Sequence, residues 1–427
     1  MHKLIYGTSD FASGIKALYE RPAFPKEVEI QASGIIEEVR KRGDEALAEF
    51  AEKFDRVKLS KEEFLLPLSE AKKLAAKLPA PDKKAIRQAL KQVQTFAKLT
   101  KPRNWMMTVR SGVKVGEKFT PMERVGVYIP GGTAPLVSTV LHTAGIAKAA
   151  GVKEIVAATP PGNTHPAVMY AMLQAGVTEI YRLGGVYGVA ALAIGTEKVR
   201  KVEKICGPGN AYVTAAKKLL YGEVGIDLVA GPSEILIIAD DSANPEFIAA
   251  DLLSQAEHGS GLEQAVLVST SEKIISAVEK ELLRQRDTLK RQTTIDKVLD
   301  NGVFLIQVPD RKIAAEIAGN YAPEHLEIHT DKPEEMARNI KAAGAIFLGQ
   351  WTPEPVGDFC AGPSHVLPTA GSAKKFNGLE SVSFFRRTSL VKYTEAALKR
   401  EVDIIDRFGA MEMLDAHGRS GTIRVKK

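Results

Sequence analysis

The feature of this sequence that most restricts its fold is a regular alternation of apolar and helical segments between residues 125 and 233. Short apolar segments such as VGVYIPGG (125–132) end in glycine, and stretches with helical spacing such as LVSTVLHTAGIAKAAG (136–151) follow them. The alternation continues to residue 220. Strands and helices that alternate at such intervals form right-handed crossover units, so this segment predicts a parallel sheet.

A second α/β block is predicted after residue 233, and the helical region before residue 100 is expected to join it. Residues 26–100 place apolar side chains at helical spacing between charged ones. A chain of 427 residues is also too long for one ordinary core. We therefore predict an α/β fold with two parallel-sheet domains. The predicted parts are an N-terminal appendage at 1–25, a first α/β domain at 26–124 plus 234–380, an inserted domain at 125–233 and a C-terminal appendage at 381–427.

The composition argues against nucleic-acid-binding, disulfide-bonded and membrane proteins. The formal net charge is only +6, and the basic residues are scattered along the chain. The two cysteines, Cys206 and Cys360, suggest neither a disulfide framework nor a thiolate zinc site. No run reaches the length of about 18 apolar residues that a membrane span needs, and the first residues do not resemble a signal peptide. We expect a cytoplasmic protein.

Three glycine-bearing turns follow predicted strands of the 125–233 block. They are Pro130–Gly132, Gly184–Gly185 and Gly207–Asn210. In a parallel sheet such turns lie together at the carboxyl edge, where glycine lets the backbone approach a pyrophosphate. The chain has no GxGxxG run, so each turn alone is equally compatible with a tight strand-to-helix connection. Together the three turns predict a crevice that binds a nucleotide; the alternative is that the glycines only permit tight strand-to-helix connections.

Several dispersed residues form a candidate metal-ligand set. Gln255 and His258 stand three apart and share a helix face. Asp358 lies in a loop seven residues before His365, and His417 follows much later in the chain. Such nitrogen and oxygen ligands suit zinc, with room for a substrate atom. Alternatively, His258 simply caps the end of its helix, where a cation is favourable.

An adjacent acid and base, Glu324 and His325, can perform proton transfer near neutral pH. The alternative is a solvated strand face, with His325, Glu327 and His329 on one side and the apolar residues between them turned inward. A thioester mechanism would instead need a nucleophilic cysteine. Cys206 precedes a glycine turn, but apolar Ile205 beside it favours a buried structural thiol.

Four ordered blocks of this sequence resemble histidinol dehydrogenase. They are residues 226–259 (IDLVAGPSEILIIADDSANPEFIAADLLSQAEHG), YAPEHLE (321–327), CAGPSHVLPT (360–369) and EMLDAH (412–417). The resemblance runs along nearly the whole chain. It implies two incomplete Rossmann-like domains with two small extra segments, in an intertwined homodimer. It also implies that L-histidinol is oxidised by NAD through L-histidinaldehyde to L-histidine, the last step of histidine biosynthesis, with one zinc ion per subunit.

The resemblance also implies roles for individual residues. Glu324 matches the residue that activates water, and His325 matches the base. Tyr187 stands where related proteins often carry a glutamine that touches the cofactor, and Ser364 where an asparagine often precedes His365. The implied zinc ligands are Gln255, His258, Asp358 and His417. The implied substrate contacts are Ser233, Gln255, His258, His325, Asp358, His365, Glu412 and His417. The implied NAD contacts are Tyr128, Tyr187 and Asn210.

Three other functions are compatible with parts of this pattern. A relative acting on another small polar alcohol, such as a sulfonated diol, would keep the ligands but differ at Glu412 and His365, and both are present. A zinc hydrolase with Glu324 as base leaves the glycine turns unexplained. A non-enzymatic nucleotide-binding protein would bind no metal.

We expect active sites shared between subunits, with Glu412 and His417 donated by the partner.

Overall fold

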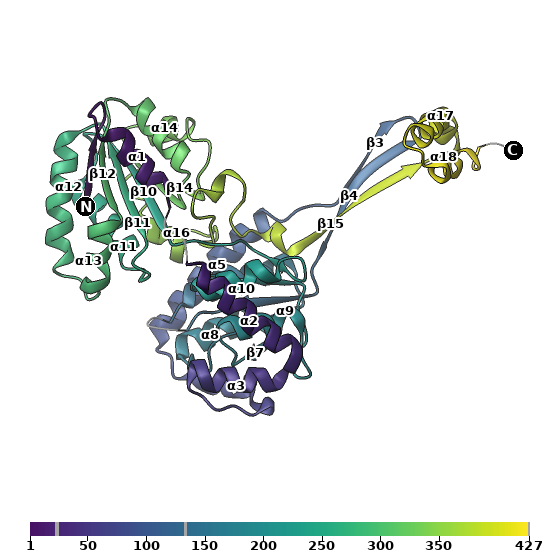
Figure 1. Cartoon of the computed structure of the whole chain (residues 1–427), viewed down its shortest axis with the longest axis horizontal. Coiled ribbons are helices and arrows are strands. Elements are labelled where there is room, and N and C mark those ends of the chain that lie inside the picture. Colours follow the sequence, from purple (N-terminus) through teal and green to yellow (C-terminus); the bar gives the residue numbers. More distant parts are fainter. Residues whose placement is uncertain (22–24, 132–134, 426–427) are drawn as a thin grey trace.

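The computed structural model describes residues 1–21, 25–131 and 135–425, so Gly132 of the first glycine turn lies outside the described residues. Two α/β bodies lie side by side, and a long arm extends away from both and ends in two helices (Figure 1). None of the described helices is long and apolar enough to cross a membrane.

The first body is built on a six-stranded, fully parallel sheet. Its order is β1 (His2–Ile5), β12 (Val303–Gln307), β11 (Gln264–Ser269), β10 (Glu234–Ala239), β13 (His325–His329) and β14 (Ala345–Leu348). Both faces are covered, which explains why strands such as EILIIA are buried throughout and apolar after their first residue. One face packs on α11 (Pro245–Ala256), α12 (Glu272–Arg286) and α13 (Gln292–Asn301). The other packs on α1 (Phe11–Tyr19), α14 (Arg311–Tyr321) and α15 (Pro333–Ala337).

The second body also has a six-stranded sheet, parallel except for its first edge strand. Its order is β2 (Leu65–Leu66), β7 (Glu179–Tyr181), β6 (Glu154–Ala158), β5 (Arg124–Tyr128), β8 (Lys204–Cys206) and β9 (Gly225–Ile226). One face packs on α2 (Lys26–Arg42), α3 (Asp44–Asp55), α9 (Gly185–Ile194) and α10 (Ala211–Leu220). The other packs on α4 (Leu68–Ala76), α5 (Ala80–Leu99), α6 (Val137–Val140), the π-helical turn Leu141–Gly145, α7 (Ile146–Ala150) and α8 (Pro166–Ala175).

The predicted placement of the early helices with residues 234–380 is wrong. Helices α2 to α5 pack on the second sheet, where Val28 and Phe50 join the core beside α9 and Leu90 and Val93 join it beside α8. An amphipathic pattern shows that a helix needs an apolar partner, but it does not say which of two sheets provides it. The predicted N-terminal appendage also differs, because β1 is an edge strand of the first sheet and Leu18 is fully buried in its core.

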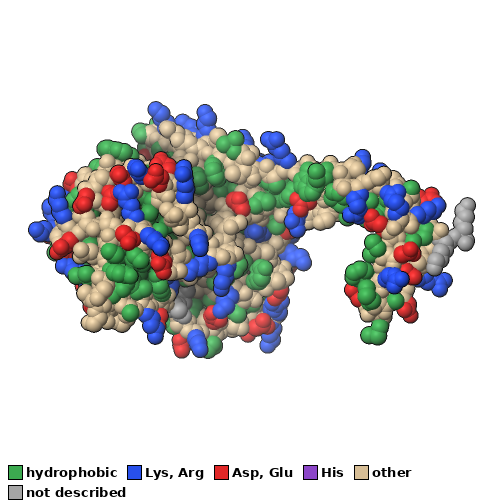
Figure 2. Space-filling model, turned by 90° about the horizontal axis from the view of Figure 1, so that it is seen from above, with side chains coloured by type: hydrophobic (Ala, Val, Ile, Leu, Met, Phe, Trp, Pro, Cys, Tyr) green, Lys and Arg blue, Asp and Glu red, His purple; other side chains and the backbone are tan. Residues whose placement is uncertain are grey.

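The arm is a three-stranded antiparallel sheet with a helical tip. Strand β4 (Val113–Pro121) pairs with β3 (Trp105–Arg110) on one side and with β15 (Phe385–Tyr393) on the other. Helices α17 (Glu395–Met411) and α18 (Asp415–Thr422) form the tip. The C-terminal segment therefore lies outside both bodies, as an appendage would, but β3 and β4 belong with it rather than with the first domain as predicted. Figure 2 shows many apolar side chains along this arm and tip.

Candidate active site

The predicted acid–base pair lies where β13 begins, facing the end of α11. His325 is 3% exposed, and its Nδ1 lies 3.1 Å from the Glu234 carbonyl oxygen and 3.2 Å from Gln255 Oε1. Burial lowers the pKa of His325 to about 4, so the imidazole is neutral and able to accept a proton. Glu324 Oε2 accepts a hydrogen bond from the Glu234 backbone N–H at 3.0 Å. Burial raises the pKa of Glu324 well above its usual value, which makes its carboxylate a stronger base.

The predicted pair on α11 also lies at this site. Gln255 is fully buried in the last turn of the helix, and its Nε2 lies 3.4 Å from His258 Nδ1. His258 Nδ1 is also 3.2 Å from the Gln255 carbonyl oxygen and 3.3 Å from that of Ser254. Donation from Nδ1 to a backbone carbonyl fixes the tautomer that leaves Nε2 free, as metal-binding histidines require.

A short helix, α16 (Glu354–Phe359), completes the cluster from the loop after β14. Asp358 on this helix lies with His325 and Glu354, and their candidate ligand atoms are all within 4.8 Å of one another. Glu354 Oε1 is 3.7 Å from His325 Nε2. Burial, with the Asp358 carboxylate beside it, raises the pKa of Glu354 to about 9. Sequence reasoning missed Glu354, although its position four residues before Asp358 on one helix face was a usable signal.

His365 joins the site from the loop after α16 and connects the two bodies. Burial lowers its pKa, and it interacts electrostatically with Asp358 and His258. Its backbone N–H donates to His142 Nδ1 at 3.3 Å, and the two rings lie 4.7 Å apart. His142 belongs to the π-helical turn of the second body, so the loop is held against that body. No sequence signal marked His142, because a buried histidine within an apolar helix looks like an ordinary core residue.

Of the remaining predicted substrate contacts, Ser233 lies near the cluster, whereas Glu412 and His417 lie far from it. Ser233 immediately precedes β10, next to Glu234, and its carbonyl oxygen accepts from the Gln264 N–H at 3.2 Å. Glu412 follows α17 and His417 lies in α18, both exposed at the tip of the arm and remote from α16 and β13 (Figure 1). The single chain therefore does not bring Glu412 or His417 to the cluster.

The predicted cofactor contacts line one cleft at the carboxyl edge of the second sheet. Tyr128, Tyr187 and Asn210 border a cavity of about 730 Å³ between that edge and helices α2 and α3. The described parts of the three glycine turns follow β5, β7 and β8, which are parallel, so they do share one edge. Tyr128 Oη accepts from the Gly185 N–H at 2.9 Å. The Asn210 side chain caps α10 by accepting from two backbone N–H groups.

Tyr187 borders this cleft, and its hydroxyl is already engaged. The hydroxyl donates to the Asp55 carboxylate at the end of α3, and the side chain is 1% exposed.

The cysteine prediction is confirmed: Cys206 is fully buried, and burial raises the pKa of its thiol to about 12. Such a thiol is a structural core group. Cys360 is exposed just after α16.

Comparison with known proteins gives one consistent family. A family model described as histidinol dehydrogenase matches residues 20–425. The histidinol dehydrogenase of Caulobacter vibrioides is 42% identical over 100% of this chain and 99% of its own length. That of Geobacillus kaustophilus is 44% identical over 92% of this chain and 93% of its own. The crystal structure of histidinol dehydrogenase from Elizabethkingia anophelis superposes with a TM-score of 0.94 at 34% identity, covering 100% of this chain and 98% of that chain.

Proposed function

The chain belongs to the histidinol dehydrogenase family, and we propose that it oxidises L-histidinol to L-histidine at the cluster around His325. The observation that carries this proposal is the meeting of Gln255, His258, Asp358 and His365 around the Glu324–His325 pair. These residues come from distant parts of the sequence.

The donor set of this cluster fits a zinc ion, with Gln255, His258 and Asp358 as its ligands and His417 of a second copy of the chain completing the set. The buried atoms His325 Nε2, Glu354 Oε1 and His365 Nε2 have no hydrogen-bond partner among the described residues, so the cluster is built to receive a further group. When bound, zinc would hold the substrate's imidazole and amino nitrogens and act as a Lewis acid. A competing ligand set is His325 with Glu354 and Asp358, whose candidate ligand atoms lie within 4.8 Å of one another.

The chain's own residues account for the proton transfers of a four-electron oxidation. His325, neutral and buried, accepts the alcohol proton as the first hydride leaves for NAD. Glu324 takes a proton from the water that adds to the aldehyde, while His325 gives its proton to the aldehyde oxygen to form the hydrate. His325, neutral again, then accepts a proton of the hydrate as the second hydride leaves for a second NAD. His365 and Ser233 position the substrate.

The cleft at the second sheet is the proposed NAD site. Gly131 after β5 and Gly185 after β7 border this cleft, where the lack of a side chain leaves room for a pyrophosphate, and Asn210 borders it at the N-terminus of α10. Gly207 has a φ of +121°, and a Cβ there would lie 2.3 Å from the Tyr128 carbonyl oxygen, so only glycine fits this turn. The cofactor therefore approaches from the second body while the substrate is held by the first.

Replacing Tyr187 with phenylalanine tests what this residue contributes to the cleft. The hydroxyl is used by Asp55, so Tyr187→Phe should lower the free energy of unfolding by about 1 kcal/mol and leave the KM for NAD nearly unchanged. Urea unfolding and initial rates at varied NAD measure the two effects. A large rise in KM without loss of stability would show that the hydroxyl contacts the cofactor instead.

The proposed assembly is an intertwined homodimer in which the tip of each arm completes the partner's site. Two observations support it: Glu412 and His417 lie at the tip, and the tip is unusually apolar for a solvent-exposed surface. The exposed apolar residues of the tip helices and their connection are Ile404 (56%), Phe408 (54%), Met411 (69%), Met413 (88%), Leu414 (42%) and Ile423 (61%). A second copy supplies the natural cover, because an isologous pair buries both tips at once.

The reaction stoichiometry tests the proposed function and its mechanism together. About two NADH should form per histidinol consumed, measured by absorbance under limiting substrate, because both oxidation steps use the same site. The double variant Cys206→Ala/Cys360→Ala should keep this ratio, since no thioester is needed. One NADH per substrate, or a folded double variant without turnover, would contradict the mechanism. Activity only with a sulfonated diol would favour the related alcohol, and hydrolysis without NADH would favour a zinc hydrolase.

A further inference from the structure

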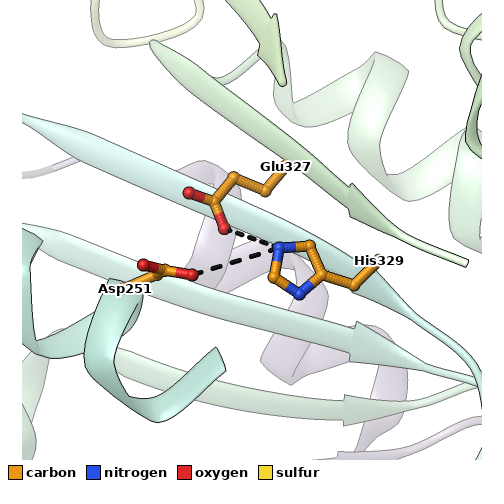
Figure 3. Close-up of side chains that lie close together, drawn as sticks. All are labelled: Asp251, Glu327 and His329. Carbon is orange, nitrogen blue, oxygen red and sulfur yellow. Dashed lines mark ion pairs between the residues drawn. The ribbon is translucent and has the colours of Figure 1, made fainter. Parts of the chain in front are cut away.

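A second cluster of ionisable side chains lies inside the first body, next to the proposed active site but not part of it. Asp251 of α11 meets Glu327 and His329 of β13, and all three point toward one another (Figure 3). The exposed fractions are 7% for Asp251, 0% for Glu327 and 2% for His329. His329 Nε2 lies 3.1 Å from Glu327 Oε2 and 4.0 Å from Asp251 Oδ2.

The position of the cluster follows from the periods of the two elements that carry it. Strand alternation puts Glu327 and His329 on the same face of β13 as His325. Helical spacing puts Asp251 one turn before Gln255 on α11. The cluster is therefore the next contact between α11 and β13 after the one between Gln255 and His325.

The protein alone does not satisfy these buried groups. Glu327 Oε1 accepts from the Glu354 N–H at 2.6 Å, but Glu327 Oε2 and both ring nitrogens of His329 have no hydrogen-bond partner among the described residues. Among the residues that the structure describes, no lysine or arginine forms an ion pair with the carboxylate of Asp251 or of Glu327. Buried carboxylates without a compensating cation are strongly unfavourable.

We propose that Asp251, Glu327 and His329 bind a second divalent cation of the zinc class, in addition to the ion of the active-site cluster. One imidazole nitrogen and two carboxylate oxygens are ligands that zinc accepts. Ligand atoms about 2.0–2.2 Å from one ion stand roughly 3–4 Å from each other, and the measured separations from His329 Nε2 are 3.1 and 4.0 Å. The two positive charges of the ion would balance the two carboxylates.

This ion would be structural, because it would join the two elements on which the active site is built. Strand β13 carries the base His325, and α11 carries Gln255 and leads into His258. Fixing α11 to β13 one helical turn behind Gln255 would hold the relative positions of the base and the first ligands. The alternative is that Asp251 and Glu327 share a proton without any metal, which the following measurements separate.

Metal content and metal position in the wild-type protein are the primary test. After equilibration with zinc and removal of free metal, wild type should hold roughly two ions per subunit and His258→Asn roughly one, because that variant lacks a ligand of the active-site ion only. Anomalous scattering at the zinc edge should place one ion between Asp251, Glu327 and His329. Absence of that peak in zinc-equilibrated wild-type crystals overturns the proposal. A peak here without one at the active-site cluster would overturn the first zinc site instead.

Variants of the cluster provide the second test. Asp251→Asn and His329→Gln should each lose roughly one ion per subunit, because each removes one of only three ligands. The control is Asp240→Asn, which alters an equally buried carboxylate of the same body that is already bonded to Arg311 and should keep the wild-type count. Added zinc should raise the Tm of His258→Asn but not of His258→Asn/His329→Gln. Wild-type counts in both cluster variants would place the ion elsewhere and overturn the proposal.

Discussion

Replacing His325 with asparagine is expected to lower kcat by about 10²- to 10⁴-fold, the usual contribution of a positioned general base, while the zinc content stays unchanged. The imidazole is buried and neutral, and its Nδ1 is held by the Glu234 carbonyl oxygen, so Nε2 is the atom available to the substrate proton. Asparagine keeps polarity and approximate size but cannot accept a proton at neutral pH. Steady-state rates and metal analysis of the same preparation measure both quantities.

The matched variant is His258→Asn, which should show the opposite pattern. The free Nε2 of His258 is a proposed zinc ligand, so the affinity for the active-site zinc should fall by more than about 100-fold. Even the loss of an outer-shell partner of a metal ligand lowers metal affinity by about 10- to 100-fold. Excess zinc should then restore part of the activity. His2→Asn, at an exposed histidine of β1, is the control and should change neither quantity. Loss of the active-site zinc from His325→Asn would favour the competing ligand set of His325, Glu354 and Asp358.

The parallel sheets could be predicted because their signals are local. Apolar runs, glycine turns and helical spacing each involve only a few neighbouring residues, and the glycine turns after β5, β7 and β8 lie at one sheet edge as expected. The assignment of α2 to α5 to a sheet could not be predicted in this way. Both sheets present apolar faces of similar character, so the choice depends on contacts between residues far apart in the sequence.

The site could be predicted in its chemically distinctive members and not in those that depend on packing. Gln255 and His258 share a helix end, as their spacing suggested, and His325 lies against Gln255, a proximity that only the family resemblance implied. His142 was missed because a buried histidine gains its role only from neighbours in space, whereas Glu354 was missed although its helical spacing from Asp358 was a usable signal. The alternative of a solvated face on β13 is wrong: Glu327 and His329 are buried under α11 and α16, so strand alternation was right but the covering helices were not foreseen.

Mixing two inactive variants, His258→Ala and His417→Ala, is expected to restore roughly a quarter of wild-type activity when they are unfolded and refolded together. His258 lies in the first body and His417 at the remote tip of the arm, so a shared site takes the first from one subunit and the second from its partner. In a mixed dimer, one active site then contains both substitutions and the other active site contains neither. Half of randomly paired dimers are mixed, and half of their sites are intact.

The control for this experiment pairs His258→Ala with His325→Ala, whose lesions both lie in the first body. Every site of that mixed dimer carries one lesion, so co-refolding should restore no activity even though heterodimers form. Native mass spectrometry of differently tagged subunits measures how many heterodimers are present. If His258→Ala and His417→Ala form heterodimers but remain as inactive together as apart, each chain completes its own site. The arm would then have to fold back onto its own first body, leaving the apolar tip residues Phe408 and Met413 to be buried within one chain.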